Sequence, residues 1–322
     1  MRAIVFLGVL GAGALSAQSP SGLLVAGNKR ANTASIVDLH TGATLAVVPT
    51  APGPHESAAS HDGKWAVVTG YGAGSPGNSL LLLDLTTRTV ARTIDLGEYR
   101  RPHGIAFLPG DSLIAVTVEA NQAVLVVHAP SGAIRRVHPT EQQSTHQMAV
   151  RPDGRVGYTA NIRSGTITEL NFITGATRAL GVASEVEGIG VTPNGREVWV
   201  GSNTAGTISI VDVASWKVVA TLDQGERPYR VTISPDGRTA AAALTISARI
   251  RLIDVATRKE VGMLEAPTNA QPVGMTWSRD GKRLYVACQG INAIAEFDVE
   301  ARKLLRTIAV GDGPDGVAIA ER

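Results

Sequence analysis

The sequence is short of cysteine, of long apolar runs and of charge of one sign. Its one cysteine, Cys288, excludes an internal disulfide, so core burial and strand pairing must hold the chain together. No stretch reaches the about 20 apolar residues that a membrane-spanning helix needs. The 30 Lys and Arg nearly balance the 28 Asp and Glu, and there is no basic tail. Nucleic acid is therefore not expected as a partner.

Helical periodicity and two common catalytic signatures are also missing. No long segment repeats its apolar residues every 3.6 positions, so amphipathic helices are not predicted. No Gly-x-Ser-x-Gly sequence occurs, which leaves an α/β-hydrolase triad unsupported. The glycine-rich segment 70–78 lacks a Walker lysine, so it does not predict a phosphate-binding loop. What is present, 35 glycines among short apolar runs, favours many short strands and tight turns.

The first 17 residues are typical of a secretory signal peptide. Arg2 supplies a positive charge, residues 3–15 are apolar, and small residues precede Gln18. We expect cleavage after Ala17, or else after Ser16, and a periplasmic or secreted product; an uncleaved membrane anchor is the alternative. We therefore divide the chain into a signal peptide (1–17) and a single domain (18–322), with no membrane span in the mature chain.

A repeat with a period of about 41 to 48 residues runs through the rest of the chain. Each copy predicts a strand, a tight turn, a second strand, a loop, and a third and a fourth strand. Asp-Gly or Asn-Gly forms the tight turn at 62–63, 153–154, 194–195, 236–237 and 280–281, and Gly-Asp replaces it at 110–111. These dipeptides are a strong hairpin signal because Gly readily adopts positive φ. Four antiparallel strands at this period describe one propeller blade.

The two ends of the chain together predict one further blade. Residues 23–26, 34–38 and 43–49 predict strands two to four, and residues 313–320 predict the missing first strand. With six continuous copies, the fold class is all-β: a seven-bladed β-propeller of four-stranded antiparallel blades, with the last blade closed by the N- and C-terminal strands. This closure leaves no open seam between the first and last blades.

Several of these strands resemble those of the bacterial and archaeal YVTN-repeat propellers. The likeness is carried by Trp65-Ala66-Val67-Val68-Thr69, Gly157-Tyr158-Thr159-Ala160-Asn161, Leu284-Tyr285-Val286-Ala287, the Pro-Asp-Gly turns and Thr207-Ile208-Ser209-Ile210-Val211-Asp212. It covers essentially the whole predicted mature chain. The resemblance to this family, which includes YncE-like proteins, implies the propeller fold. It does not imply one chemistry, because fold does not carry function.

One position of the repeat, near the start of each first strand, collects titratable residues. From copy to copy it is occupied by His55, His103, His146, Glu187, Tyr229, Val273 and Asp315. First strands surround the axis of a propeller, so we expect these side chains to form a ring at one mouth of the channel. Three of the seven histidines fall in this one position, which is more than chance placement gives.

Three interpretations of this ring are open. His55, His103, His146 and Glu187 are ligand types for one divalent metal ion, which can activate a water molecule. The same groups can instead form a metal-free site for a polar ligand, or act as a general base. The third interpretation is structural, because duplicated repeats inherit their residues and Pro-His can simply bond to the neighbouring blade.

Polar residues of nearby loops are expected to surround the ring. The loops after the second strands should open on the same mouth, because each second strand returns to where the first began. We include the following residues, beside the ring, in the candidate ligand site: Glu56, Tyr71, Arg101, Glu119, Asn161, Arg163 and Arg230. Arginine and amide groups suit an anionic or oxygen-rich ligand.

Other residues with possible chemistry predict structure. Asp38, Asp84, Asp212, Asp254 and Asp298 end equivalent third strands, where they are expected to accept turn N–H bonds. Cys288 is expected to be a buried, inert thiol. The remaining histidines, His40, His61, His128 and His138, are predicted to be surface residues.

Two functions from different classes fit these observations. The first is an exported binding protein, expected to be a monomer, that recognises a small molecule, a peptide or a partner protein at the channel mouth. The second is a metal-assisted hydrolase, lactonase or lyase that uses the same His and Glu residues. No complete catalytic signature is present, so the sequence favours binding over catalysis.

Overall fold

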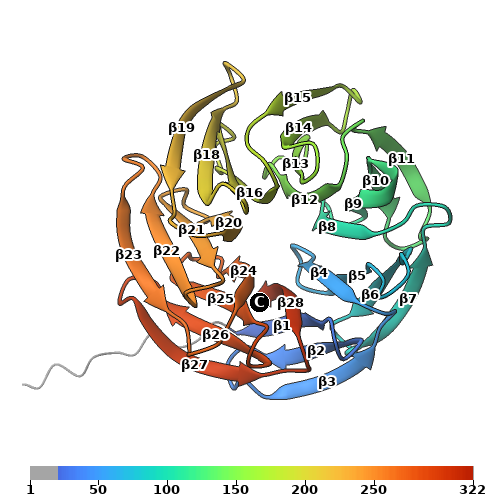
Figure 1. Cartoon of the computed structure of the whole chain (residues 1–322). Helices are drawn as coiled ribbons and strands as arrows, with labels where there is room; N and C mark the ends of the chain where they lie inside the picture. Colours follow the sequence, from blue (N-terminus) through green and yellow to red (C-terminus); the bar gives the residue numbers. More distant parts are fainter. Residues whose placement is uncertain (1–20, 322) are drawn as a thin grey trace, which may run out of the picture.

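The computed structural model describes residues 21–321, which form seven four-stranded antiparallel sheets arranged as the blades of a propeller (Figure 1). The predicted all-β, seven-bladed fold is confirmed. The predicted signal peptide lies outside the described residues. The one helical element in this range is a 3₁₀ turn, η1 (Glu119–Asn121), and no helix here is long and apolar enough to cross a membrane.

Each blade has an inner strand beside the central channel, followed outward by three more strands. The inner strands are β4 (Pro54–Ala59), β8 (Pro102–Phe107), β12 (Thr145–Val150), β16 (Val186–Val191), β20 (Pro228–Ile233), β24 (Pro272–Trp277) and β28 (Pro314–Glu321). The second strands are β5 (Trp65–Gly70), β9 (Leu113–Val118), β13 (Val156–Asn161), β17 (Glu197–Ser202), β21 (Thr239–Leu244), β25 (Arg283–Cys288) and β1 (Gly22–Asn28).

The two outer strands of each blade complete the sheet. The third strands are β6 (Ser79–Asp84), β10 (Ala123–His128), β14 (Thr166–Asn171), β18 (Thr207–Asp212), β22 (Arg249–Asp254), β26 (Ala293–Asp298) and β2 (Thr33–Asp38). The fourth strands are β7 (Thr89–Asp95), β11 (Ile134–Pro139), β15 (Thr177–Gly181), β19 (Lys217–Asp223), β23 (Glu260–Glu265), β27 (Lys303–Ala309) and β3 (Thr44–Pro49). We number the blades 1 to 7 in the order of the inner strands just given, so that blade 7 contains β28, β1, β2 and β3.

Blade 7 joins the two ends of the chain, as predicted. Strand β28 pairs antiparallel with β1, with Ile319 opposite Leu24 and Val317 opposite Ala26. In Figure 1 the red C-terminal strand accordingly lies beside the blue N-terminal strands. The ring is therefore closed by hydrogen bonds between segments almost 300 residues apart in the sequence.

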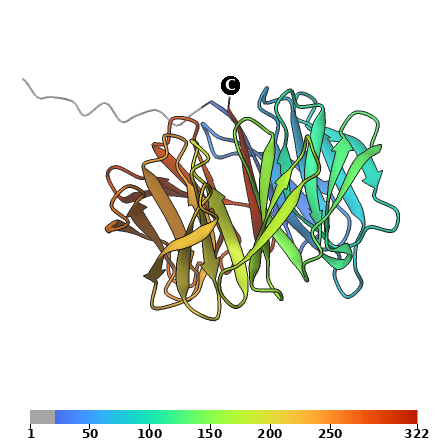
Figure 2. The same cartoon turned by 90° about the horizontal axis from the view of Figure 1, so that it is seen from above.

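The core lies between neighbouring blades. Second and third strands are buried on both faces, which explains why they are nearly continuous apolar runs. Val67 and Leu80 of blade 1, for example, belong to one cluster with Ile114 and Leu125 of blade 2. The fourth strands face solvent and are more polar. Seen from the side, the strands run between the two faces of the ring (Figure 2).

The predicted roles of the turn carboxylates and of Cys288 are confirmed, and one histidine corrects the prediction. Asp254 Oδ1, for example, accepts the backbone N–H of Thr257 at 2.7 Å. Cys288 is fully buried, and burial raises the pKa of its thiol to about 12. His138 was predicted to lie on the surface, but it is buried with its ring edge against Phe172. An outer strand can still be covered where the next blade packs against it.

Candidate functional site

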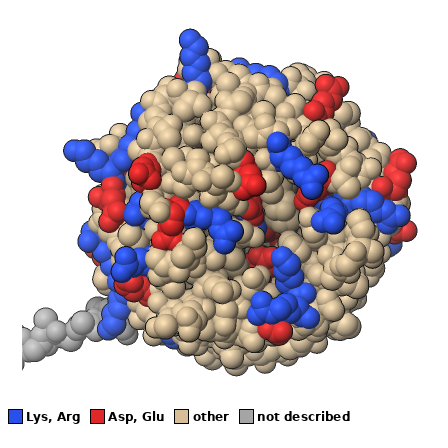
Figure 3. Space-filling view, viewed as in Figure 1, with Lys and Arg blue, Asp and Glu red and all other residues tan. Residues whose placement is uncertain are grey.

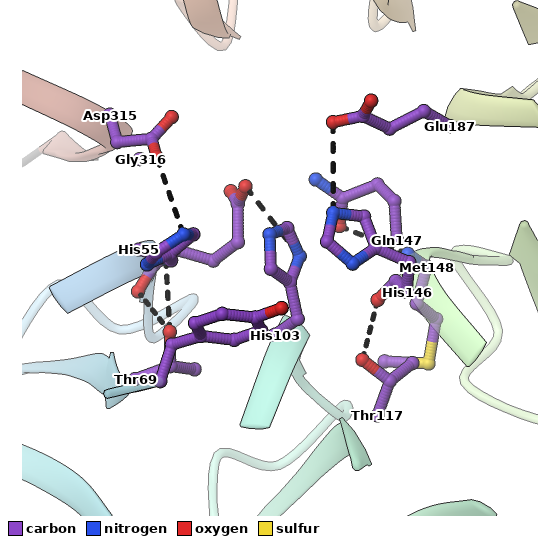
Figure 4. Close-up of polar contacts among 12 residues, drawn as sticks. His55, Thr69, His103, Thr117, His146, Gln147, Met148, Glu187, Asp315 and Gly316 are labelled. Atoms are coloured by element: carbon purple, nitrogen blue, oxygen red, sulfur yellow. Dashed lines mark hydrogen bonds and ion pairs between the residues drawn. The ribbon is translucent and has the colours of Figure 1, made fainter. Parts of the chain in front are cut away.

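The seven ring residues defined by the repeat lie at the end of the channel where the inner strands begin, which we call the ring mouth. They are His55, His103, His146, Glu187, Tyr229, Val273 and Asp315. In Figure 4 the three imidazoles lie side by side, with Asp315 next to His55 and Glu187 beyond His146. On the face of the molecule shown in Figure 3, acidic and basic side chains are interspersed.

A β-bulge at the start of the inner strands directs two successive side chains toward the channel. In blade 1, Pro54 pairs with Gly70 and Ser57 pairs with Val68, so His55 and Glu56 both stand opposite Thr69. The hydroxyl of Thr69 accepts the backbone N–H of Glu56 at 2.9 Å. Bulges are known to re-aim side chains in this way. Because of the bulge, the residue after a ring residue can also place its side chain in the channel.

At this second position, long side chains alternate with glycine around most of the channel. Blades 1, 3 and 5 carry Glu56, Gln147 and Arg230, and the other four blades carry Gly104, Gly188, Gly274 and Gly316. A Cβ atom on Gly316 would lie 2.5 Å from Glu56 Cα, and one on Gly188 would lie 2.7 Å from Arg230 Cα. Neighbouring inner strands approach so closely that only glycine fits there.

Arg230 closes the channel below the ring. Its guanidinium donates a hydrogen bond of 2.5 Å to Glu56 Oε1, on blade 1. It donates another, of 2.8 Å, to Glu187 Oε1 on the adjacent blade 4. Glu56 thus lies three blades away from Arg230 around the ring, with blades 6 and 7 between them. Below Arg230 lies a cavity of about 400 Å³, whose lining includes Glu56, Gln147 and Arg230 itself. The ring mouth is therefore a recess with a charged floor.

The histidines form a compact aromatic group above this floor. The rings of His103 and His146 stack with centroids 3.5 Å apart and planes 29° apart. His55 lies edge-on to His103 with centroids 5.3 Å apart, and the Tyr71 ring lies 4.2 Å from His55. Sequence reasoning had placed these four residues near one mouth, and the structure brings them into direct contact.

The stacked imidazoles differ in protonation because their surroundings differ. Burial opposes a charge on His146, but Glu119 Oε2 lies 2.9 Å from Nδ1 and Glu187 Oε1 lies 3.6 Å from Nε2. These contacts outweigh burial and raise the pKa of His146. Likewise burial opposes ionisation of Glu187, yet His146 and Arg230 lower the pKa of this carboxyl to about 2. Among the three imidazoles, His146 is thus the one whose pKa is raised.

The other two imidazoles are held neutral. Burial and the Lys29 ammonium lower the pKa of His55 to about 4. Burial, with help from His146 and His55, lowers the pKa of His103 well below its usual range. Two imidazoles whose pKa is lowered therefore lie beside one whose pKa is raised.

A chain of polar residues from three loops supports the stacked imidazoles. Arg101 Nη1 donates to the Tyr71 hydroxyl at 2.7 Å, and this hydroxyl donates to Glu119 Oε2 at 2.7 Å. Burial and Glu119 raise the pKa of Tyr71 to about 12, so its proton stays in place. Arg101, Tyr71 and Glu119 thus orient His146 from outside the ring.

Several buried polar atoms of the ring have no hydrogen-bond partner within residues 21–321. They are His103 Nδ1, both carboxylate oxygens of Asp315 and Arg230 Nε. The side chain of Asp315 is 1% exposed, and its nearest cations are Lys29 Nζ at 3.5 Å and His55 Nε2 at 4.0 Å. His103 Nδ1 lies 3.9 Å from Glu56 Oε1.

Two predicted site residues lie apart from this group. Asn161 is fully buried in blade 3, where its amide donates to Thr166 and Thr168 and accepts from Thr159. It braces a loop and is not available to a ligand. Arg163 is exposed in the loop between β13 and β14. Tyr229 keeps its ring position, with the guanidinium of Arg230 4.7 Å from its centroid.

A metal ion at the ring needs the donor atoms of the predicted ligands to be free and to surround one point. Among the described residues, no three or more His, Cys, Asp or Glu side chains are arranged as a metal site. Both ring nitrogens of His146 already face carboxylates, so neither offers a free lone pair to a metal ion. In this arrangement, the set of His55, His103, His146 and Glu187 does not fit a metal ion.

Two residues of the site were not among the predicted ligands. Lys29 contacts Asp315, and Gln147 places its side chain at the channel, where Oε1 accepts the Met148 N–H at 3.0 Å. Gln147 occupies the same repeat position as Glu56 and Arg230, so the alignment of the copies contained the signal. Lys29 follows a second strand, in the class of loops predicted to line this mouth.

Comparisons with known proteins support the fold only. No protein-family model and no curated protein sequence matches this chain. Among solved structures, the fold is similar to that of Kuenenia stuttgartiensis hydrazine synthase, with a TM-score of 0.72 and 18% identity, covering 84% of this chain and 90% of that chain. At this identity the likeness concerns the fold alone. The seven-bladed propeller is thus established by topology and by comparison, whereas the YVTN-type resemblance has no matching family model.

Proposed function

We propose that this chain is an exported, monomeric β-propeller that binds a small polar molecule at the ring mouth. The observation that carries the proposal is the group of buried atoms on His103, Asp315 and Arg230 that make no hydrogen bond within residues 21–321. Buried polar groups in folded proteins are nearly always hydrogen-bonded, so a ligand or ordered water is required there. Export rests on the signal-like segment 1–17, and sequencing of the mature N-terminus, expected at Gln18, tests it.

The chemistry of the recess favours a ligand that donates hydrogen bonds. A carboxylate such as that of Asp315 accepts hydrogen bonds, and a neutral imidazole such as that of His103 has one accepting nitrogen. Glu56 adds a carboxylate at the same place. An amine or a polyol fits these acceptors, and the stacked rings provide an apolar wall. The recess is deep, since His103 is 1% exposed, which favours a small molecule over a protein surface.

A thermal-shift screen of amines, amino acids and polyols tests this proposal. At least one compound is expected to raise the melting temperature of the wild-type protein and to lose this effect in Asp315→Asn. Asp312→Asn is the matched control, because Asp312 is about half exposed and pairs with Arg30 outside the ring. The proposal fails if no compound separates the wild-type protein from Asp315→Asn.

Catalysis is the second candidate, and the pair of stacked imidazoles favours it. Neutral His103 can accept a proton while charged His146 donates one, and opposite protonation states at one site are typical of acid–base chemistry. A hydrolase, lactonase or lyase would use this pair. Turnover of a lactone or ester, lost in His103→Ala, would support it, whereas binding without turnover would leave the first proposal.

The metal-dependent version is kept as a separate hypothesis. A divalent ion on His55, His103, His146 and Glu187 would require His146 to leave its carboxylate partners. Elemental analysis of protein that has been stripped of metal and then reloaded tests it. About one ion per chain, lost in His103→Ala, would support the site; no uptake would remove it.

A further inference from the structure

A second hollow opens beside the ring, between blades 5 and 6. It has a volume of about 800 Å³, within the range of small-ligand pockets, about 300–1,000 Å³. Its walls come from the loops that join β21 to β22 and β23 to β24, and two ring residues, Tyr229 and Val273, form its inner side. We call it the side pocket. It is roomier than the cavity of about 400 Å³ below Arg230 and is lined by different residues.

Blade 5 departs from the repeat where the side pocket begins. In the other six blades, the residue before the inner strand adopts the left-handed conformation, as in Arg101 and Gln271, but Arg227 does not. The bulge differs as well. Pro228 pairs with Leu244 and Arg230 with Ala243, which leaves Tyr229 alone as the inserted residue. The backbone therefore takes a different course at Arg227 and Tyr229, and both of these residues line the side pocket.

Arg227 is a cation without a partner acid. Its guanidinium carbon lies 5.5 Å from the centroid of the Tyr229 ring, and its Nε is buried without a hydrogen bond. No ion pair connects it to an acid of the described chain. The nearby acids are engaged elsewhere: Glu265 pairs with Arg249 at 3.1 Å, and Glu226 accepts the N–H groups of Ile246 and Ser247.

Glu265, which pairs with Arg249, also lines the pocket, and the other polar lining groups besides Arg227 are uncharged. The side-chain amides of Asn269, Gln271 and Gln289 make no hydrogen bond to another residue within 21–321, and each amide can both donate and accept. Ile246, which is 74% exposed, adds an apolar surface. One fixed cation with several amides suits a single carboxylate carried on a hydroxylated body, because Arg binds carboxylates through two parallel bonds.

We infer that the side pocket binds a hydroxylated carboxylate of the size of one or two sugar rings, with its carboxylate on Arg227 and its hydroxyls on the amides of Asn269, Gln271 and Gln289. This site is separate from the ring site and does not depend on it. It meets the ring at Tyr229 and Val273, so both sites open on the same mouth.

Isothermal titration calorimetry with D-glucuronate, and with D-glucose as its uncharged counterpart, tests the inference. Glucuronate is expected to bind more tightly than glucose. Arg227→Gln should weaken glucuronate binding by at least about tenfold, and Arg227→Lys should weaken it less, because it keeps the charge without the fork. Arg238→Gln, at a side chain that is 86% exposed, is the matched control. Thermal denaturation verifies that each variant is folded.

Asp315→Asn separates this site from the ring. It should leave glucuronate binding within about twofold, because Asp315 does not line the side pocket. If Asp315→Asn abolishes binding while Arg227→Gln does not, glucuronate occupies the ring, and the side-pocket inference is overturned while the ring proposal stands. Equal affinity for glucose and glucuronate, or no measurable glucuronate binding at millimolar concentration, also overturns it. An Arg227-dependent affinity with a negative amine and polyol screen upholds it and removes the ring proposal instead.

Discussion

Two equivalent positions of the repeat behave in opposite ways. The last residue of the third strand is Asp in five blades, Asn171 in blade 3 and His128 in blade 2, and all seven bond to the turn that follows. The ring position instead carries His, Glu, Tyr, Val and Asp, and each side chain has different neighbours. A turn is local, so the same residue serves in every blade. The axis is shared, so seven residues of five types can make one asymmetric site.

The largest loss of stability is expected from opening the closed ring of blades, on which both positions depend. Deletion of residues 313–322 removes β28, which pairs with β1 and lines the channel. We expect the melting temperature to fall by at least about 10 °C, or the protein not to fold. Circular dichroism melting measures this, and an unchanged melt would contradict the composite blade.

The glycines beside the ring should matter far more than a glycine with open space around it, such as Gly181. In Gly316→Ala, the new methyl group would lie within 2.6 Å of backbone atoms of His55, Glu56 and Ser57. We expect a loss of about 2–3 kcal/mol in the free energy of unfolding, measured by urea denaturation. Gly181→Ala is the control, because nothing lies within 4 Å of the position that its new methyl group would take. Equal effects would show that close packing of the inner strands is unimportant.

The neutral histidines predict a loss of stability in acid. The pKa of His55 is about 4 when folded and 6.5 when unfolded. Between these values the unfolded chain binds the proton, so the free energy of unfolding falls as pH decreases from about 6.5 to about 4. His146 has the opposite sign: its raised pKa contributes stability below about 6.5 that is lost as pH rises through the folded value.

Replacing His55 should therefore flatten only the acid side of the stability profile. We expect His55→Gln to reduce the loss between pH 6.5 and 4 by on the order of 1–3 kcal/mol, measured by urea denaturation across this range. His61→Gln is the matched control at an exposed imidazole. An unchanged profile would show that His55 does not carry the acid sensitivity.

The smallest effect is expected at the repeated turn position. Asp38→Ala removes an acceptor of the Thr41 N–H and hydroxyl, at 2.7 and 2.8 Å. Because this side chain is exposed, we expect the melting temperature to fall by only about 1–3 °C. Ligand binding at the ring mouth should not change. A change in ligand binding would show that the repeated turn position is not purely structural, against the distinction drawn between it and the ring position.

Much of the site could be predicted because the repeat fixes equivalent positions. Aligning the copies placed His55, His103 and His146 at one mouth, and Tyr71 and Glu119 on loops that reach it. The alignment did not show which side chains face inward. Asn161 was expected at the rim but is buried among threonines of its own blade. Strand alternation alone predicts that His55 and Glu56 point to opposite faces, and the bulge overrides it.

The sequence by itself determined the number of blades, their four strands, the closure by both chain ends and the location of the ring, because each depends on local patterns repeated along the chain. Tertiary structure alone decided that Arg230 bridges to Glu56, that the pKa of His146 is raised while that of His103 is lowered, and that blade 5 opens a side pocket. These features depend on distances between residues far apart in sequence, and on a burial that exists only once the ring has closed. Local patterns carry no information about either quantity.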